Sequence, residues 1–498
     1  MSVAKPPPRL GMGTKLSYGL GSVAFGVASQ ALSTSIIVQY LNLAVGISAV
    51  LVGAAIMVSQ IVDAVVDPLV GQWSDGVRTR WGRRHPFMYA AALPCAVAFY
   101  ALWHPPTAWA PMQLFAYMVG VLVIVRIFNA MYEIPSSALA PELAPDYNER
   151  TSLIAYRWLF GVAGAGVMVA LLNMVFLRRD ATHTLGSLNR EGYSQWGTIA
   201  AVVILVSILL SSLATHRLIP TLALSPPRKS SFGSALRESF RALANPSMAA
   251  LMASGLISGI AGGVTATVNP YLYLHFWGLA PQTTAILILA SIPATFLGTF
   301  LAPWVSSKYG KKRTMISLFA ISLVASLIPI SLRLLDVMPP NGTPWLTPIL
   351  LVDAFVAGVL GLMGYIIVSS MVADVVEDNA AKTGVRSEGL LFAANGLLPK
   401  VTAGVGAFAG SLIVTAVHFP AHAQQGTVDP HIIRNLGLAY LPVSAVMSAL
   451  AIFVLRFYRI DQATHERNLA NLQEAAATAE MAHGEDPATR AAAITQIT

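Results

Sequence analysis

The chain has 498 residues, of which 55% are hydrophobic and 11% are charged. Soluble domains carry about 25% charged residues, so this composition excludes an ordinary soluble protein and is typical of a polytopic membrane protein. The net charge of +8 does not indicate nucleic-acid binding, because the basic residues stand in short loops between apolar runs. The single cysteine, Cys95, excludes an intrachain disulfide.

Apolar runs of spanning length recur about twelve times and predict an all-α membrane protein. The expected spans are 15–41, 48–73, 86–104, 110–138, 152–177, 194–217, 246–275, 281–306, 313–334, 344–377, 386–417 and 431–458. A long basic connection divides them. We therefore expect an N-terminal half over 1–217, a cytoplasmic middle linker over 218–245, a C-terminal half over 246–459 and a cytoplasmic tail over 460–498.

Basic residues concentrate in alternate connections, as after the second, sixth and eighth spans. Because such loops stay on the inner side of a membrane, both termini are predicted to be cytoplasmic. The expected location is the plasma membrane, which in a bacterium is the inner membrane.

Two acids stand in the second span. Asp63 and Asp67 are one helical turn apart, and the stretch 49–70 carries no other charge. Residues at i and i+4 share one face of a helix. An ionised carboxylate at mid-membrane costs roughly 2.5–3.5 kcal/mol even on the lenient insertion scale. The pair therefore indicates a polar interior that binds an ion, a proton or a substrate, the alternative being a structural pair between helices.

The fourth span places Arg126 and Glu133 on one helix face, seven residues apart. A carboxylate can accept two hydroxyl hydrogen bonds at once, which suits a sugar. Glu133 is therefore a candidate substrate contact, and charge balance with an arginine is the other reading. A structural role and a functional role remain open for Arg126.

An internal repeat links the two halves. The segment DPLVGQWSDGVRTRWGRRHP after the second span is echoed by LAPWVSSKYGKKRT after the eighth. Parallel repeats of this kind are the signature of the major facilitator architecture. The predicted fold is thus a major facilitator fold with twelve transmembrane helices in two six-helix halves.

Three stretches resemble one branch of that superfamily, the glycoside–pentoside–hexuronide:cation symporters typified by melibiose permease. They are VDAVVDPLVGQWSDGVRTRWGRRHP, MYEIPSSALAPEL with NERTSLIAYRWLFG, and MVADVVEDNAAKTGVRSEGLLFAANGLLPK. The resemblance covers most of the membrane region. It implies cation-coupled transport of a sugar-like solute by alternating access, with no enzyme activity.

The resemblance also implies site residues. Its cation site falls on Asp63 and Asp67, with Lys400 facing them. Its substrate contacts fall on Glu133, Arg157, Tyr365 and Asn395, and we expect Arg157 to pair with Glu133 across the cavity. Two further substrate candidates do not come from the matched pattern: Arg126 lies outside the matching motif, and Ser137 stands where the family has a tryptophan. Charged residues at the cytoplasmic ends of the helices could form gating salt bridges between the halves, or could serve topology alone. The expected gating residues are Asp75, Arg83, Arg84, Asp374, Glu377 and Arg386.

Two departures from the family pattern bear on the coupling ion. Val66 and Ala130 stand where the sodium-using prototype has polar side chains. Sodium wants several oxygen ligands, whereas a proton needs only a suitable carboxylate. We therefore expect proton coupling, with Na⁺ at Asp63 and Asp67 as the alternative.

The expected partners are a small-molecule substrate, most simply a sugar or glycoside, and the lipid bilayer. No cofactor, catalytic residue or other metal site is indicated, and family members commonly act as monomers. A lipid or lysolipid carrier on the same fold is the alternative function, since these departures make the cavity more apolar. A membrane enzyme or sensor finds no support, because no Walker A loop, GxSxG elbow or HExxH pair is present.

Overall fold

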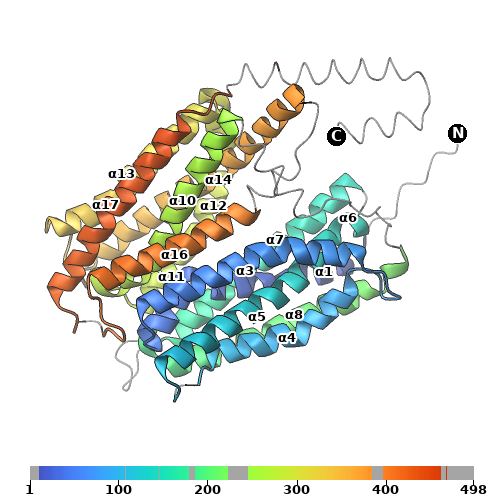
Figure 1. The fold of residues 1–498 in the computed structure, drawn as a ribbon, viewed down its shortest axis with the longest axis horizontal. Helices are drawn as coiled ribbons and strands as arrows, with labels where there is room; N and C mark the ends of the chain where they lie inside the picture. Colours follow the sequence, from blue (N-terminus) through green and yellow to red (C-terminus); the bar gives the residue numbers. More distant parts are fainter. Residues whose placement is uncertain are drawn as a thin grey trace.

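The computed structural model describes residues 10–106, 108–144, 146–178, 186–221, 245–383, 396–424, 426–460 and 467. Within these residues the molecule consists of helices, which form two bundles (Figure 1). The predicted middle linker and tail lie almost entirely outside the described residues.

Helices of the N-terminal half are α1 (Met12–Ala31), α2 (Thr34–Val38), η1 (Gln39–Ala44), α3 (Ala49–Gly76), α4 (His85–Trp103), α5 (Pro111–Ala138), α6 (Ala140–Leu143), α7 (Tyr147–Leu171), η2 (Leu172–Phe176), η3 (Gly186–Leu188), α8 (Arg190–His216) and η4 (Ile219–Thr221). Helices of the C-terminal half are α10 (Pro246–Tyr271), η5 (Leu272–Phe276), α11 (Pro281–Leu289), α12 (Ser291–Tyr309), α13 (Lys311–Leu334), α14 (Leu346–Thr383), α16 (Leu398–Ala416) and α17 (Pro430–Leu455).

Eleven of the described helical segments are long and apolar enough to cross a membrane, or twelve if the bent pair Met12–Ala31 and Thr34–Ala44 is one span. The predicted first span is thus broken. Ser33 adopts an extended backbone conformation, and the two pieces meet at 53°. The break falls at the polar run Ser33, Thr34 and Ser35, which the expected span 15–41 passes over.

The internal repeat is visible in the structure. The first helix of each half, α1–α2 and α10, passes into a π-helical segment, η1 and η5 respectively. Both copies of the repeated motif begin in the last turns of the second span of their half, α3 and α12, and run into the connection that follows. In the second copy Gly310 has φ +79°, a conformation that favours glycine and that lets the chain turn directly into α13.

Among the described residues, the hydrophobic core joins the two halves at one end of the molecule. The largest buried cluster contains residues of both halves, among them Tyr40, Trp103 and Tyr271. The other two clusters each stay within one half. Hydrogen bonds cross the halves at the joined end, from Tyr271 OH to Asn42 Oδ1 at 2.8 Å and from Ser35 Oγ to the Ala266 carbonyl at 2.8 Å.

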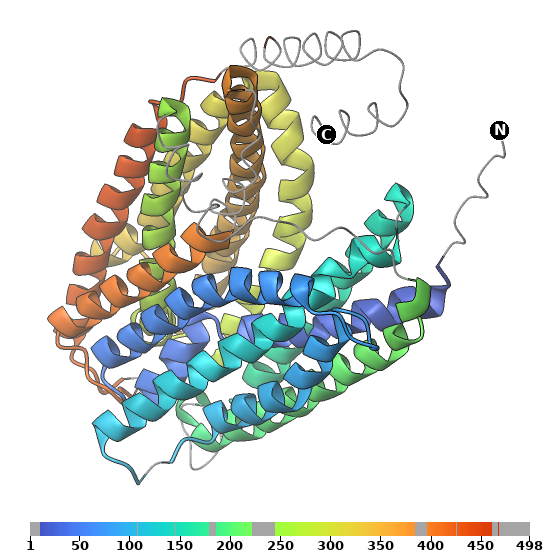
Figure 2. The same ribbon diagram turned by 45° about the vertical axis from the view of Figure 1, so that its right-hand side comes forward.

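The bundles diverge toward the opposite end, which carries the start of α1, the α3–α4 connection and the end of α17 (Figure 2). This is the end that the charge pattern predicts to be cytoplasmic. We refer to the two ends as the closed end and the open end.

Candidate functional site

A cluster of four charged side chains lies between the halves. Lys400 Nζ, at the start of α16, lies 2.7 Å from Asp63 Oδ2 and 2.5 Å from Asp67 Oδ2 on α3. Arg126 Nη1 on α5 lies 3.5 Å from Asp63 Oδ2, and its Nη2 donates to the Leu32 carbonyl. Two carboxylates thus face two basic groups, and Lys400 is the member that belongs to the other half.

Close packing of α3 against α16 brings Lys400 to the acids. A Cβ at Gly53 would lie 2.2 Å from Ser411 Oγ, and one at Gly404 would lie 3.0 Å from Gln60 Cβ. Glycines at both places therefore let the two backbones approach. Figure 1 shows α16 along α3, with its residue numbers falling as those of α3 rise.

The acids differ in exposure. Asp63 is buried, with 7% of its side chain exposed, whereas 23% of the Asp67 side chain and 28% of the Lys400 side chain are exposed. Removing one partner of a buried ion pair leaves an uncompensated charge and is strongly destabilising. The cluster therefore ties α3 to α16 electrostatically, and the Asp67–Lys400 contact is the part that water reaches most easily.

The second group of charges lies within the N-terminal half. Arg157 Nη2 on α7 donates to Glu133 Oε1 on α5 at 2.5 Å, so the pair expected from the sequence is present. Arg157 Nη1 donates to Ser136 Oγ at 2.8 Å and to Tyr18 OH at 3.4 Å. Tyr18 OH in turn donates to the Ser136 carbonyl at 2.7 Å.

Glu133 keeps one oxygen available. Its Oε2 is buried and has no hydrogen-bond partner within the described part of the chain. Glu133 and Arg157 border a cavity of about 350 Å³ with Ser29, Gln30 and Trp158, from α1 and α7. A buried carboxylate oxygen without a hydrogen bond lowers the stability of the fold, so Oε2 is a candidate acceptor for a hydrogen bond from a ligand.

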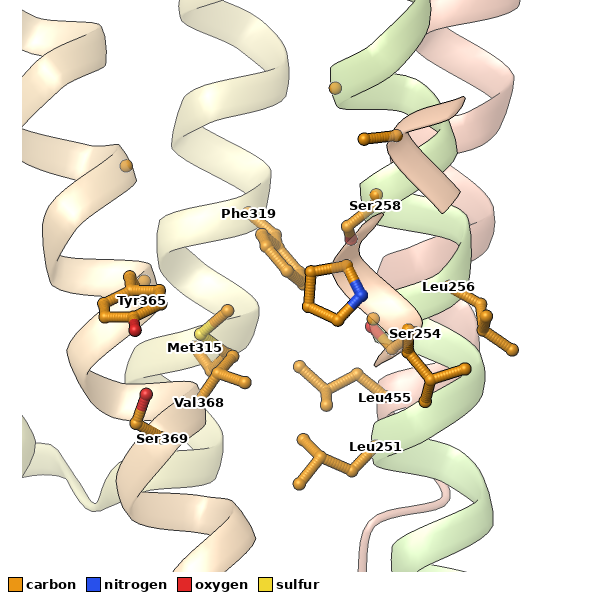
Figure 3. A pocket seen from close by; sticks show the side chains of 18 of the residues that line it. Leu251, Ser254, Leu256, Ser258, Met315, Phe319, Tyr365, Val368, Ser369 and Leu455 are labelled. Carbon is orange, nitrogen blue, oxygen red and sulfur yellow. The ribbon is translucent and has the colours of Figure 1, made fainter. Parts of the chain in front are cut away.

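A larger cavity, of about 460 Å³, lies in the C-terminal half (Figure 3). Tyr365 and Ser369 border it from α14, and Ser254 and Ser258 border it from α10. The rest of the lining is mostly apolar, including Leu251, Met252, Leu256, Met315, Leu318, Phe319, Leu360, Val368, Val372 and Leu455. Tyr365 is 68% exposed, so its ring is available to a ligand.

The two cavities approach each other at the α1–α2 bend. Gln30 at the end of α1 borders the smaller one, and Thr34 at the start of α2 borders the larger one. Pro399, which neighbours Lys400, also borders the larger cavity. A solute between the halves would therefore lie close to both charged groups.

Four of the expected gating residues, Asp75, Arg83, Arg84 and Asp374, form ion pairs within their own halves. Arg84 lies 2.5 Å from Asp75, and both Arg83 and Arg84 reach Glu142 Oε1. In the other half Lys311 lies 2.6 Å from Asp374. Salt bridges between the halves stay a prediction for the conformation that closes this end.

Some site residues lie elsewhere than the sequence led us to expect. We expected Arg126 among the substrate contacts, but it belongs to the Asp63 cluster. Its guanidinium contacts Asp63 on α3 and the Leu32 carbonyl, and no hydrogen bond or ion pair among the described residues joins it to Glu133. Ser137 is exposed, and its Oγ donates to the Ile134 carbonyl of its own helix. Asn395 and Arg386 lie outside the described residues.

Sequence reasoning also missed contributors. Ser136 and Tyr18 bind Arg157, Glu142 binds both loop arginines, and Trp158 borders the cavity. Ser136, Glu142 and Trp158 stand inside the resembling stretches, so their polar or aromatic character was the available signal. Tyr18 lies outside these stretches, so no such signal singled it out.

The chain is similar to known transport proteins in sequence and in fold. The family model described as MFS/sugar transport protein matches residues 17–462. The chain is 26% identical to the uncharacterized symporter sll1374 of Synechocystis sp., over 93% of this chain and 97% of that protein. It is 25% identical to the isoprimeverose transporter of Lactiplantibacillus pentosus, over 92% and 91% of the two chains.

Among solved structures, the crystal structure of the nucleoside transporter NupG superposes with a TM-score of 0.60 at 15% identity. The match covers 90% of this chain and 100% of the other. At this identity the likeness supports the fold alone, and it agrees with the two-half architecture described above.

Proposed function

Because the chain belongs to the MFS/sugar transport protein family, and is a multi-pass membrane transporter rather than an enzyme, we propose that it is a proton-coupled symporter of a sugar or glycoside. It works by alternating access in the plasma membrane, the inner membrane of a bacterium, as a monomer with both termini cytoplasmic. The kinship with an isoprimeverose transporter and with a putative glycoside/cation symporter of Escherichia coli supports a glycoside cargo.

The observation that carries the sugar assignment is the unpartnered Glu133 Oε2 beside a cavity. Arg157 neutralises the other oxygen of the same carboxylate and holds the group in place. A hydroxyl of the cargo would donate to Oε2, and an indole face such as that of Trp158 suits the apolar face of a sugar ring. Polyhydroxylated rings present both features at once.

The coupling step follows from the Lys400 cluster. In this conformation Lys400 and Arg126 balance the charges of Asp63 and Asp67. A proton on Asp67 removes one of the two negative charges that hold Lys400 and leaves Asp63 as its partner, so it weakens the contact between α3 and α16. Proton binding would thereby change the relative free energy of the two conformations, which is what coupling requires.

Sodium coupling remains the runner-up for the ion. It needs additional oxygen ligands beside the two carboxylates, and Val66 and Ala130 offer none from their side chains. We therefore favour the proton.

A second cargo class, a lysolipid-like amphiphile, is favoured by one observation. The 460 Å³ cavity of the C-terminal half is lined mostly by apolar side chains (Figure 3). An acyl chain or an apolar aglycone would fit such a lining.

The test uses purified protein in liposomes and records pH change on addition of glycosides, disaccharides, uronic acids and lysolipids, with and without sodium. We expect a sugar to cause a pH change without sodium in wild type and in Asp336→Asn, but not in Asp67→Asn. Asp336 is a matched control, since it is exposed and its φ of +59° suits asparagine. A response to lysolipids alone would overturn the sugar assignment.

A further inference from the structure

A third membrane-embedded acid lies apart from both charged groups. Asp353 belongs to α14, seven residues after Leu346, in the apolar run ILLVDAFVAG. It lies in none of the stretches that carry the family resemblance. Acids in spans are rare because they are costly, and they face the protein interior when they occur.

Asp353 borders a cavity of about 180 Å³. The polar side chains around it come from several elements: Thr265 and Asn269 from α10, Tyr273 from η5 and Tyr440 from α17. Thr265 Oγ1 and Tyr440 OH are hydrogen-bonded at 2.9 Å. The cavity is roomy enough for water and offers it several polar partners within a largely apolar lining, which makes it a place where a carboxyl group can exchange a proton.

No basic residue borders this cavity within the described part of the chain. The titratable groups that face Asp353 are the phenols of Tyr273 and Tyr440, and the lining residues of α10, α11 and α13 contribute none. Arg333, one turn beyond Ile330 on α13, is engaged elsewhere. Its guanidinium donates to the Pro339 carbonyl at 2.9 Å and to Asn341 Oδ1 at 2.6 Å.

The contrast with the first acid pair is direct. Asp63 and Asp67 face Lys400 and Arg126, whereas no ion pair among the described residues includes Asp353. A carboxylate in an apolar span without a basic partner is stabilised most simply by taking up a proton. The neutral carboxyl can then donate a hydrogen bond to a hydroxyl or to water.

The position of the cavity relates it to the closed end. It shares Asn269 and Tyr273 with a neighbouring cavity of about 170 Å³, which Ser35, Gln39 and Asn173 border from the N-terminal half. On its other side it shares Ser322 and Leu360 with the cavity of Figure 3. Asp353 therefore lies between the contact that closes one end and the cavity that borders Tyr365.

We propose that Asp353 is a second proton-binding site, in the C-terminal half, that takes up its proton independently of Asp63 and Asp67. A proton is favoured over a metal ion because no group of three or more His, Cys, Asp or Glu side chains in the described residues could hold a metal. The proposal concerns an acid outside the coupling cluster, so it stands whether or not the cargo is a sugar.

The experiment is a pH titration of purified full-length protein by infrared difference spectroscopy, which detects the carbonyl stretch of a protonated carboxyl. The variants are Asp353→Asn, the control Asp336→Asn, and the double variant Asp63→Asn/Asp67→Asn. Size-exclusion profiles establish that each is folded, and Asp353→Glu replaces the asparagine variant if that one is not. A shift of the band in Asp353→Glu then serves as the signature.

We expect one pH-dependent carboxyl band to be lost in Asp353→Asn, retained in Asp336→Asn and retained in the double variant. A spectrum of Asp353→Asn identical to wild type would overturn the proposal, as would loss of the same band in the double variant. Displacement of the band by sodium at fixed pH would instead make the site a sodium site and overturn the proton assignment. No cargo is needed, so failure here is distinguishable from failure of the transport proposal.

Discussion

Lys400 is the only basic side chain from the C-terminal half in the described ion pairs with Asp63 and Asp67. Substituting it with alanine removes a charge that both carboxylates share, and Arg126 alone then faces two acids. We expect Lys400→Ala to lower the thermal stability of the purified protein, and Asp67→Asn to restore part of it in the double variant. The coupling energy in the cycle should be about 1–3 kcal/mol.

Thermal unfolding in detergent of the wild type, the two single variants and the double variant measures that coupling. If the two single effects simply add, the Asp67–Lys400 contact does not contribute to stability. The account of the cluster would then be wrong.

Tyr18 positions Arg157 without carrying a charge. Tyr18→Phe removes the hydrogen bond to the Ser136 carbonyl and the contact with Arg157 Nη1, while it keeps the ring. We expect a loss of about 1–2 kcal/mol in the free energy of unfolding, together with weaker cargo binding. The control is Tyr309→Phe, whose side chain is exposed. Equal melting temperatures and affinities for both variants would contradict this role.

At the scale of elements, the approach of α3 to α16 depends on Gly53. A leucine there would meet Ser411, whose Oγ lies 2.2 Å from the Cβ position, whereas a Cβ at Gly120 on α5 has no atom within 4 Å. Overpacking costs about 1–3 kcal/mol, which corresponds to a change of roughly 5- to 150-fold in a conformational equilibrium. Gly53→Leu should therefore open the closed end.

The measurement is maleimide labelling of Gln39→Cys, since Gln39 borders the cavity between the halves at that end. The native Cys95 is buried and gives little background. Labelling from the outer side should be faster with Gly53→Leu and unchanged with Gly120→Leu. Equal rates in the two backgrounds would show that this contact does not hold the end closed.

The charged residues of this element pair were partly predictable from the sequence. Acids in an apolar span stand out by composition alone, so Asp63 and Asp67 were found without any resemblance. Lys400 is placed opposite them only through the family pattern, because nothing in its own expected span, 386–417, indicates which residues of another helix it faces. The break at Ser33 has a local signal in the polar run Ser33–Ser35, whereas the contact of Gly53 with Ser411 depends on tertiary packing, which hydropathy does not encode.

At the scale of the whole molecule, two cavities of different character lie on the two halves. The fold, the repeat and the Glu133–Arg157 pair were all expected. The sequence alone does not show which apolar residues line the C-terminal cavity. Met315 and Phe319 line it, but apolar residues fill every span. Asp353 was visible in the sequence but lay outside the resembling stretches.

Filling the C-terminal cavity separates the two cargo classes. A Cβ at Gly361 on α14 has no atom within 4 Å, so Gly361→Leu fits without a clash while it occupies cavity volume. Because we place the sugar against Glu133, we expect sugar-driven pH change to persist and any lysolipid response to be lost. A folded Gly361→Leu protein that loses the sugar response would place the sugar in the C-terminal cavity instead.

The central claim is that a proton at Asp67 drives the cargo against its gradient. We would load liposomes with the protein, impose an inward proton gradient without sodium, and measure accumulation of the sugar that scores in the panel. We expect wild type to accumulate the sugar above equilibrium, and Asp67→Asn to reach equilibrium only while it still exchanges internal for external sugar. Equal accumulation by the two proteins, or none by wild type unless sodium is added, would contradict it.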